Sequence, residues 1–184
     1  MKNKNKDLIV FIDSGDTLVD ESTEVFDEGG TVVSADLIEG ADEMIRDLFK
    51  RGYRIALVAD GRTQSFENVY NQHKLYHVFE AKVISQEEGV EKPHQQMFTV
   101  AMERLGLSDA DKHRIVMIGN NLKRDVLGAN NMGITSILIS YSPRYVMQPE
   151  NNDERPDYVV AKPSELTALL DVLYLQVRNK SILK

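Results

Sequence analysis

Residues 9–18 read IVFIDSGDTL, and this stretch decides which fold the chain is expected to adopt. The apolar run from Ile9 to Ile12 is typical of a buried β-strand. A carboxylate, Asp13, stands where this strand leaves the core, and small and acidic residues follow it. An aspartate in this place is most often a turn or cap residue. Its role therefore depends on what the rest of the chain brings to the same place.

The remainder of the 184-residue chain alternates apolar strands with amphipathic helices. This alternation predicts an α/β fold, a Rossmann-like three-layer α/β/α arrangement with a mostly parallel central sheet. A chain of this length can build one sizeable core, so we expect residues 1–184 to form a single domain. The expected strands are 7–12, 53–59, 81–85, 114–119, 135–140 and 157–160, and the expected helices are 39–52, 62–74, 93–105, 122–132 and 164–177.

The composition excludes several classes of function. A net charge of −7 disfavours binding to nucleic acid, whose phosphates attract a basic surface. The absence of cysteine excludes disulfides, thiolate metal sites and a cysteine nucleophile. Apolar runs fall far short of the roughly 20 residues that a membrane span needs, and no apolar segment of signal-peptide length follows the basic residues 1–6. We therefore expect a cytoplasmic protein without a membrane partner.

Polar residues follow several of the expected strands. Asp13 ends the first, Asp60 follows the second, and Asn120 follows the strand at 114–119, with Asp125 one turn later. Lys92 stands directly before a helix that a proline opens. In a parallel sheet the carboxyl ends of the strands lie at one edge, which is where such folds bind ligands. These side chains are therefore expected to converge.

With these residues in this order, residues 7–140 resemble the haloacid dehalogenase superfamily, most of whose members are magnesium-dependent phosphohydrolases. The first motif of that family, D-x-D-small-T-apolar, corresponds to residues 13–18. The second, Thr or Ser followed by Asn or Asp and then Gly, corresponds to residues 59–61. The third is a lysine, here Lys92, and the fourth, G-D-x-x-x-x-D, corresponds to residues 119–125.

The resemblance implies a role for each motif residue. Asp13 would be the nucleophile that forms an aspartyl-phosphate, and Lys92 would neutralise phosphoryl oxygens and orient Asp13. A weakly bound Mg²⁺ would be held by Asp13, the backbone carbonyl of Gly15 and an oxygen from Asn120 or Asp125, a set of hard ligands that suits this ion. The residues implied in binding phosphate or substrate are Ser14, Gly15, Asp16, Ala59, Asp60, Gly61 and Lys92.

The chain departs from the family pattern at three of these positions. The second aspartate of the first motif, the general acid of the family, is replaced by Gly15, and such an acid contributes about 10²–10⁴ in rate. Ala59 lacks the hydroxyl that would bind a phosphoryl oxygen, and Asn120 replaces a carboxylate near the metal. The resemblance therefore implies attenuated activity, with acyl or aryl phosphates, whose leaving groups need little protonation, as the better substrates.

The segment between the first motif and the helix at 39–52 is too short for the cap domain that larger members insert there. Residues 19–35 are expected to form only a short flap. Members without a cap have open sites, which accept either phosphorylated small molecules or larger substrates, or are closed by a neighbouring subunit in a homo-oligomer.

Two other functions are compatible with the sequence. One is a non-catalytic module that keeps the fold and binds phosphate, a ligand or a protein. The other is a metal-independent hydrolase like the dehalogenases that give the superfamily its name, which also lack an acid two residues after the nucleophile. Those proteins have caps, however, and this chain has none.

Residues outside the motifs are interpreted as surface residues. His73, His77, His94 and His113 match no motif, and no pair has convincing metal-binding spacing. The loop after the strand at 135–140 carries Tyr141, Arg144 and Tyr145. We interpret these as exposed loop residues, with a place at the rim of the site as the alternative.

Overall fold

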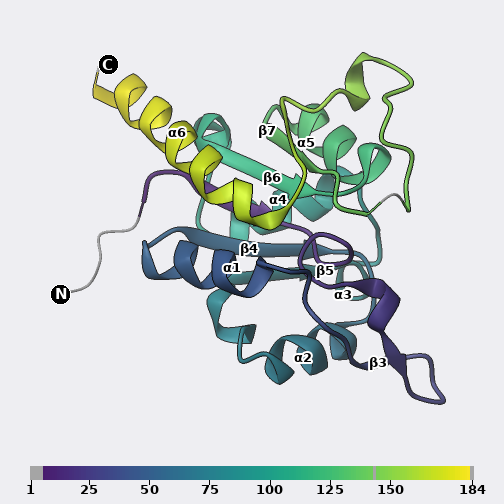
Figure 1. Cartoon of the computed structure of the whole chain (residues 1–184). Coiled ribbons are helices and arrows are strands. Elements are labelled where there is room, and N and C mark those ends of the chain that lie inside the picture. The colour runs from purple at the N-terminus through teal and green to yellow at the C-terminus, as the bar shows by residue number, and fades with distance from the viewer. Residues whose placement is uncertain (1–5, 143, 183–184) are drawn as a thin grey trace.

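The structure is a computed structural model that describes residues 6–142 and 144–182, and Figure 1 shows the course of the chain. The strands are β1 (Ile9–Ile12), β2 (Val25–Phe26), β3 (Val32–Ser34), β4 (Arg54–Ala59), β5 (Ala81–Ile84), β6 (Ile115–Gly119), β7 (Thr135–Ile139) and β8 (Tyr158–Val160). The α-helices are α1 (Ala41–Lys50), α2 (Thr63–Gln72), α3 (Ser85–Glu88), α4 (Gln95–Arg104), α5 (Leu127–Met132) and α6 (Pro163–Ile182). Shorter helical turns are η1 (Glu21–Thr23), η2 (Tyr76–Val78), η3 (Asp109–Arg114), η4 (Leu122–Val126) and η5 (Asn152–Glu154).

The central sheet has six strands in the order β5-β4-β1-β6-β7-β8, and all neighbouring strands run parallel. In the middle of the sheet, Phe11 of β1 pairs with Ala56 of β4 on one side and with Met117 of β6 on the other. The chain builds the sheet outward from β1 through β4 to β5, and then returns to the other side of β1 with β6. The carboxyl end of β1 is thus a switch point, where open α/β sheets bind ligands.

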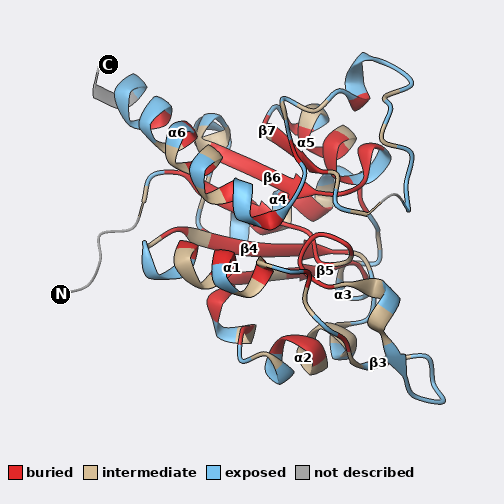
Figure 2. Cartoon of the chain, viewed as in Figure 1, coloured by how far each residue is buried: buried red, intermediate tan, exposed pale blue. Residues whose placement is uncertain are grey.

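Successive side chains of the strands point to opposite faces of the sheet, and each face is covered by helices. Val10 and Ile12 share one core with Ile45 of α1 and Leu170 of α6. Ile9 and Phe11 belong to the second core, which α4 and α5 cover. Figure 2 shows the buried strands between helices whose outer sides are exposed. The predicted three-layer α/β/α fold with a parallel sheet is therefore confirmed.

The element boundaries differ from the predicted ones in ways that affect the site. The helix expected from residue 93 begins at Gln95, and the side chain of His94 accepts a hydrogen bond from the backbone of Gln96 at its start. The helix expected over 122–132 opens with η4, a π-helical turn, before α5 begins. A short extra helix, α3, follows β5 directly. These local turns were not visible in the hydrophobic periodicity.

Residues 25–34, within the segment expected to be a flap, form a hairpin of the antiparallel strands β2 and β3. The hairpin projects from the body of the molecule beside α2 (Figure 1). The Asn68 side chain of α2 donates to the carbonyl of Val32 at 2.9 Å, and Arg62 binds the carbonyl oxygen of Gly29. These contacts hold the hairpin close to the carboxyl edge of the sheet.

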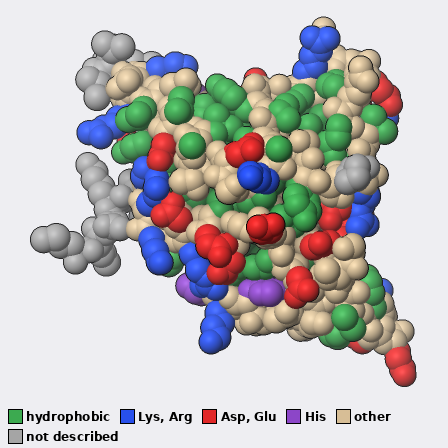
Figure 3. Space-filling view, in the orientation of Figure 1, with side chains coloured by type: hydrophobic (Ala, Val, Ile, Leu, Met, Phe, Trp, Pro, Cys, Tyr) green, Lys and Arg blue, Asp and Glu red, His purple; other side chains and the backbone are tan. Residues whose placement is uncertain are grey.

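Charged side chains of both signs are spread over the surface of the protein. On the face seen in Figure 3, lysine and arginine side chains are interspersed with aspartate and glutamate, and no continuous basic stripe crosses it. No helix in the described part of the chain is both long and apolar enough to cross a bilayer.

Candidate active site

The carboxyl end of β1 delivers Asp13 to the switch point of the sheet. Its backbone N–H donates to the carbonyl of Ile118 at 2.9 Å, which continues the pairing of β1 with β6 one residue beyond the strand. Its carboxylate lines a small cavity of about 50 Å³ at this edge. A rigid strand flanked on both sides by other strands therefore fixes the position of this carboxylate.

Lys92 lies between two carboxylates. Its Nζ donates to Oδ1 of Asp13 and to Oδ1 of Asp125, each at 2.6 Å, and its side chain is 2% exposed. Burial lowers the pKa of this ammonium, but Asp125 and Asp13 outweigh that effect and the net shift is upward. Lys92 therefore stays charged and can neutralise anionic oxygens beside Asp13.

Asp125 reaches the site from η4 and is almost completely buried. Its Oδ2 accepts from the backbone N–H of Asn121 at 3.0 Å. Burial raises the pKa of this carboxyl, against the opposing effect of Lys92. A Cβ on Gly119 would overlap the Asp125 side chain, so the glycine at the end of β6 makes the room that this carboxylate occupies.

The two asparagines after β6 have different surroundings. Asn120 is 2% exposed and lines the cavity beside Asp13, and its Nδ2 has no hydrogen-bond partner among the described residues. Asn121 is engaged locally, because its Oδ1 accepts from the backbone N–H of Lys123 at 2.9 Å and caps η4. A buried amide with an unsatisfied end is unusual, so Asn120 is the asparagine with capacity for a ligand.

Of the second motif, only Asp60 presents its side chain to the site. It accepts from the backbone N–H of Lys92 at 3.0 Å and from Arg124 at 3.3 Å, and burial raises its pKa. Ala59 is buried in the core. The N–H of Gly61 donates to Ser85 at 2.9 Å, so this amide is already satisfied.

The rest of the first motif is also divided between fold and site. The hydroxyl of Ser14 forms a buried hydrogen bond with Tyr70 at 2.8 Å, and Ser14 lines not this cavity but the outer one described below. Asp16 has a φ of 48°, and its carboxylate accepts from Arg144 at 2.7 Å and from the backbone of Glu21 at 3.2 Å. Gly15 lines the cavity. In this turn it is therefore Asp16, and not Gly15, whose backbone adopts the left-handed conformation.

Glu21 and Tyr145 line the same cavity, although the motifs did not identify them. Oε2 of Glu21 pairs with Arg144 at 2.9 Å. Burial raises the pKa of the Glu21 carboxyl to about 7, helped by Asp16, while Arg144 opposes the rise. Sequence spacing gave no signal for Glu21. Tyr141, Arg144 and Tyr145 are exposed as predicted, and Tyr145 also lines the cavity.

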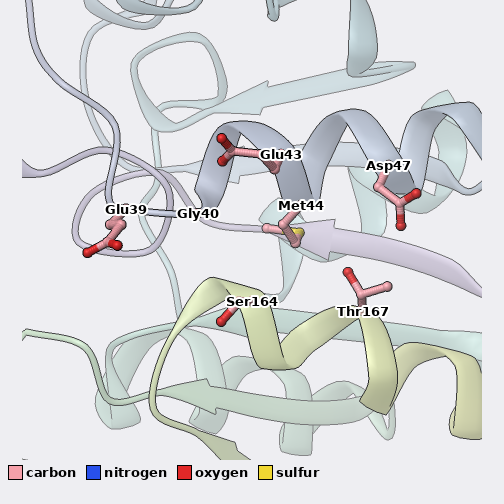
Figure 4. A pocket seen from close by; sticks show the side chains of 7 residues that line it. All are labelled: Glu39, Gly40, Glu43, Met44, Asp47, Ser164 and Thr167. Carbon is pink, nitrogen blue, oxygen red and sulfur yellow. The ribbon is translucent and has the colours of Figure 1, made fainter.

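A second, outer cavity of about 220 Å³ adjoins the first and extends beneath the hairpin. Both cavities are lined by Gly15, Glu21 and Asp60. A larger hollow of about 480 Å³ lies elsewhere, between the start of α1 and the start of α6 (Figure 4). Its lining includes the carboxylates of Glu39, Glu43 and Asp47 and no cationic side chain, so it does not suit a phosphate group.

The oxygen donors at the site suit a hard cation such as Mg²⁺. Among the described residues, no three His, Asp or Glu side chains are grouped so as to hold a metal ion by themselves. A cation would therefore depend on Asp13 and Asp125 together with neutral oxygens, those of Asn120 and the Gly15 carbonyl. The unsatisfied Nδ2 of Asn120 is a hydrogen-bond donor, which suits an anionic oxygen such as that of a phosphoryl group and not a cation.

Comparison with known proteins identifies the family of the chain. The family model described as haloacid dehalogenase-like hydrolase matches residues 12–139. The glyceraldehyde 3-phosphate phosphatase of Methanopyrus kandleri is 32% identical over 129 residues, which cover 70% of this chain and 53% of that protein. The chain belongs to the haloacid dehalogenase-like hydrolase family, and it spans about half the length of the curated relatives it matches.

Solved structures share the fold. An uncharacterised protein from Listeria monocytogenes serotype 4b has a TM-score of 0.72 at 20% identity, covering 90% of this chain and 98% of that one. The HAD-hydrolase YfnB from Bacillus subtilis, solved with magnesium, has a TM-score of 0.64 at 24% identity, covering 73% of this chain and 56% of that one.

Proposed function

We propose that the protein is a magnesium-dependent phosphohydrolase that acts through an aspartyl-phosphate on Asp13. The observation that carries the proposal is the buried contact of 2.6 Å between Asp13 and Lys92 at the switch point of the sheet. Phosphoryl transfer depends mainly on positioning and on stabilisation of charge. A fixed carboxylate beside a buried cation provides both.

The reaction has two displacements at phosphorus. In the first, an oxygen of Asp13 forms a bond to phosphorus while the bond to the leaving oxygen breaks, and that oxygen takes the electron pair. In the second, water attacks the aspartyl-phosphate and the Asp13 carboxylate leaves, which releases inorganic phosphate. Lys92 neutralises the phosphoryl oxygens in both steps and holds one oxygen of Asp13 in place.

Mg²⁺ would be held by Asp13, Asp125, the Asn120 amide oxygen and the Gly15 carbonyl. When bound, it would supply positive charge to the phosphoryl oxygens. YfnB, solved with magnesium, is a relative in fold that supports this assignment. Since one of these side chains is a neutral amide where the family has a carboxylate, we expect weak binding.

The substrate class follows from the two cavities and the relatives. The relative from Methanopyrus kandleri is a glyceraldehyde 3-phosphate phosphatase, and the outer cavity, of about 220 Å³, has a volume suited to a small organic group. We therefore propose a phosphorylated small molecule, either a phosphomonoester or an acyl phosphate. Gly15 carries no carboxyl that could protonate a leaving group. Acyl phosphates need no such proton, so they are the substrates that depend least on a general acid.

The test is release of inorganic phosphate from acetyl phosphate and from p-nitrophenyl phosphate, with Mg²⁺ and after its removal by a chelator. We expect activity that requires Mg²⁺ and that falls roughly 10³-fold or more in Asp13→Asn, since loss of a nucleophile costs at least this much. Asp36→Asn is the matched control, because Asp36 is exposed and lies outside both cavities.

Equal activity of Asp13→Asn and the unmodified protein would overturn the assignment of the nucleophile. Activity that survives complete removal of divalent cations would overturn the proposed dependence on magnesium. Absence of phosphate release from both compounds would favour a non-catalytic binding module.

A further inference from the structure

Glu21 stands between the two cavities of the site. The inner cavity contains Asp13 and Lys92, whereas the outer one is lined by Phe26 and Phe66. A substrate with its phosphoryl group beside Asp13 and its organic part in the outer cavity has its leaving oxygen at the border between them. Glu21 lines both cavities, so its carboxyl lies where this oxygen must be.

The position of the carboxyl depends on the missing side chain of Gly15. A Cβ built on Gly15 would overlap Oε1 of Glu21. The Glu21 carboxyl thus fills the space into which a side chain at position 15 would project. Its backbone is fixed by the hydrogen bond from Glu21 N to Asp16, and the cap formed by Asp20 holds η1 in place.

The two oxygens of Glu21 have different environments. Oε2 pairs with Arg144 at 2.9 Å. Oε1, the oxygen nearest to Gly15, has no hydrogen-bond partner among the described residues. One oxygen is therefore anchored and the other is free to meet a ligand.

The neighbouring carboxylates are already engaged. Asp60 accepts from the backbone of Lys92 and from Arg124, and Asp16 accepts from Arg144 and from the backbone of Glu21. Asp16 also lines neither cavity. Glu21 is the remaining carboxyl that borders both the nucleophile and the outer cavity.

We infer that Glu21 is a catalytic residue that exchanges a proton with the leaving oxygen of the substrate, in place of an acid at position 15. This inference rests on the proposed function. In the first displacement the proton of the Glu21 carboxyl moves to the leaving oxygen, which yields an alcohol and the Glu21 carboxylate. In the second, that carboxylate takes a proton from the attacking water, and Asp13 leaves as a carboxylate.

The test compares substrates with different leaving groups. For Glu21→Ala and Glu21→Gln, we expect kcat/KM for alkyl phosphates such as glycerol phosphate to fall about 10²-fold or more, the usual contribution of general acid catalysis. The value for acetyl phosphate should change little, because its leaving carboxylate needs no proton. Glu28→Gln on the exposed tip of the hairpin is the matched control, and thermal melting checks the fold of each variant.

A swap of carboxyl positions provides a second measurement. In the Glu21→Ala background, Gly15→Asp should restore part of the alkyl phosphatase activity, because the space that a side chain at position 15 needs is then free. In the unmodified protein, Gly15→Asp meets the Glu21 carboxyl and should give no comparable gain.

The outcomes separate the inference from the proposed function. Suppose that the protein hydrolyses acetyl phosphate. If Glu21→Ala then lowers kcat/KM equally for all leaving groups, or lowers it for none, the role of Glu21 is overturned and Asp13 remains the nucleophile. An unmodified protein that cleaves acetyl phosphate but no alkyl phosphate would also overturn it. Absence of hydrolysis of every compound would instead count against the proposed function itself.

Discussion

At the scale of single residues, Lys92 forms a buried ionic group with the carboxylates of Asp13 and Asp125. Replacing one partner of a buried ionic group leaves uncompensated charge, which typically costs about 3–5 kcal/mol. We expect Lys92→Met to lower the free energy of unfolding by this amount, measured by urea denaturation. Lys123→Met is the matched control, since Lys123 pairs with Glu150 at the exposed surface, and it should leave the free energy of unfolding nearly unchanged.

The loss in Lys92→Met should depend on pH. Burial raises the pKa of the Asp125 carboxyl, and the Lys92 ammonium lowers it. In Lys92→Met the burial remains but the cation is gone, so the pKa of Asp125 rises further. A carboxyl whose pKa is raised in the folded state destabilises the fold as pH rises past its unfolded value. The deficit should therefore be larger at pH 8 than at pH 5. A deficit that grows on acidification would contradict this account of the site.

Some residues of the site could be predicted from spacing and others could not. Asp13, Lys92, Asn120 and Asp125 follow strand ends or precede a helix, and a parallel sheet brings such positions to one edge. Glu21 has no comparable signal. Its place depends on a turn in which Asp16 adopts a left-handed conformation and on the following short helix, and neither has a hydrophobic period that sequence analysis can detect.

At the scale of secondary-structure elements, α5 packs closely against α4 and against Pro93, the residue that follows Lys92. A Cβ on Gly128 of α5 would overlap the ring of Phe98 and would lie 3.4 Å from Cα of Pro93, next to Lys92. We expect Gly128→Ala to lower the free energy of unfolding by about 1–3 kcal/mol, because overpacking a dense core costs this much. Phosphate release should also fall, since relief of the overlap displaces the segment that carries Lys92.

The effect of Gly128→Ala can be separated from a general effect of alanine on the chain. Gly29→Ala is the control, since Gly29 lies at the exposed hairpin and its Cβ would meet only the flexible Asp27 side chain. Residues in contact give non-additive effects on stability. Phe98→Leu combined with Gly128→Ala should therefore cost less than the sum of the two single substitutions, and strict additivity would contradict the proposed contact.

The elements themselves were predictable to different degrees. The buried strands and the helices with a continuous apolar side were found from periodicity, because burial on one side leaves that pattern in the sequence. Periodicity did not reveal the π-helical turn that carries Asp125. It also did not reveal the hairpin from Val25 to Ser34. Val25 and Phe26 are more than half exposed, at 53% and 55%, so no alternation of buried and exposed residues marks β2.

At the scale of the whole molecule, the order of the strands links the fold to the proposed chemistry. β1 lies in the middle of the sheet with parallel neighbours on both sides, and its end is the place where the chain reverses the direction in which strands are added. Helices on both faces leave that edge as the side at which a ligand can reach the strand ends. Tyr145 lines the inner cavity, and the hairpin lines the outer one with Phe26, Gly30 and Val32. The outer cavity is where we propose that the organic part of a substrate binds.

The most direct test of the central claim, that Asp13 is the nucleophile, is to identify the phosphorylated residue. The protein is mixed with acetyl phosphate and Mg²⁺, quenched in acid and reduced with borohydride, which converts an aspartyl-phosphate into homoserine. Mass spectrometry of the peptide that contains residues 9–18 then reads the modification. The account predicts homoserine at position 13 and none in Asp13→Asn. Phosphate release with an unmodified Asp13, or with the modification on a different residue, would contradict it.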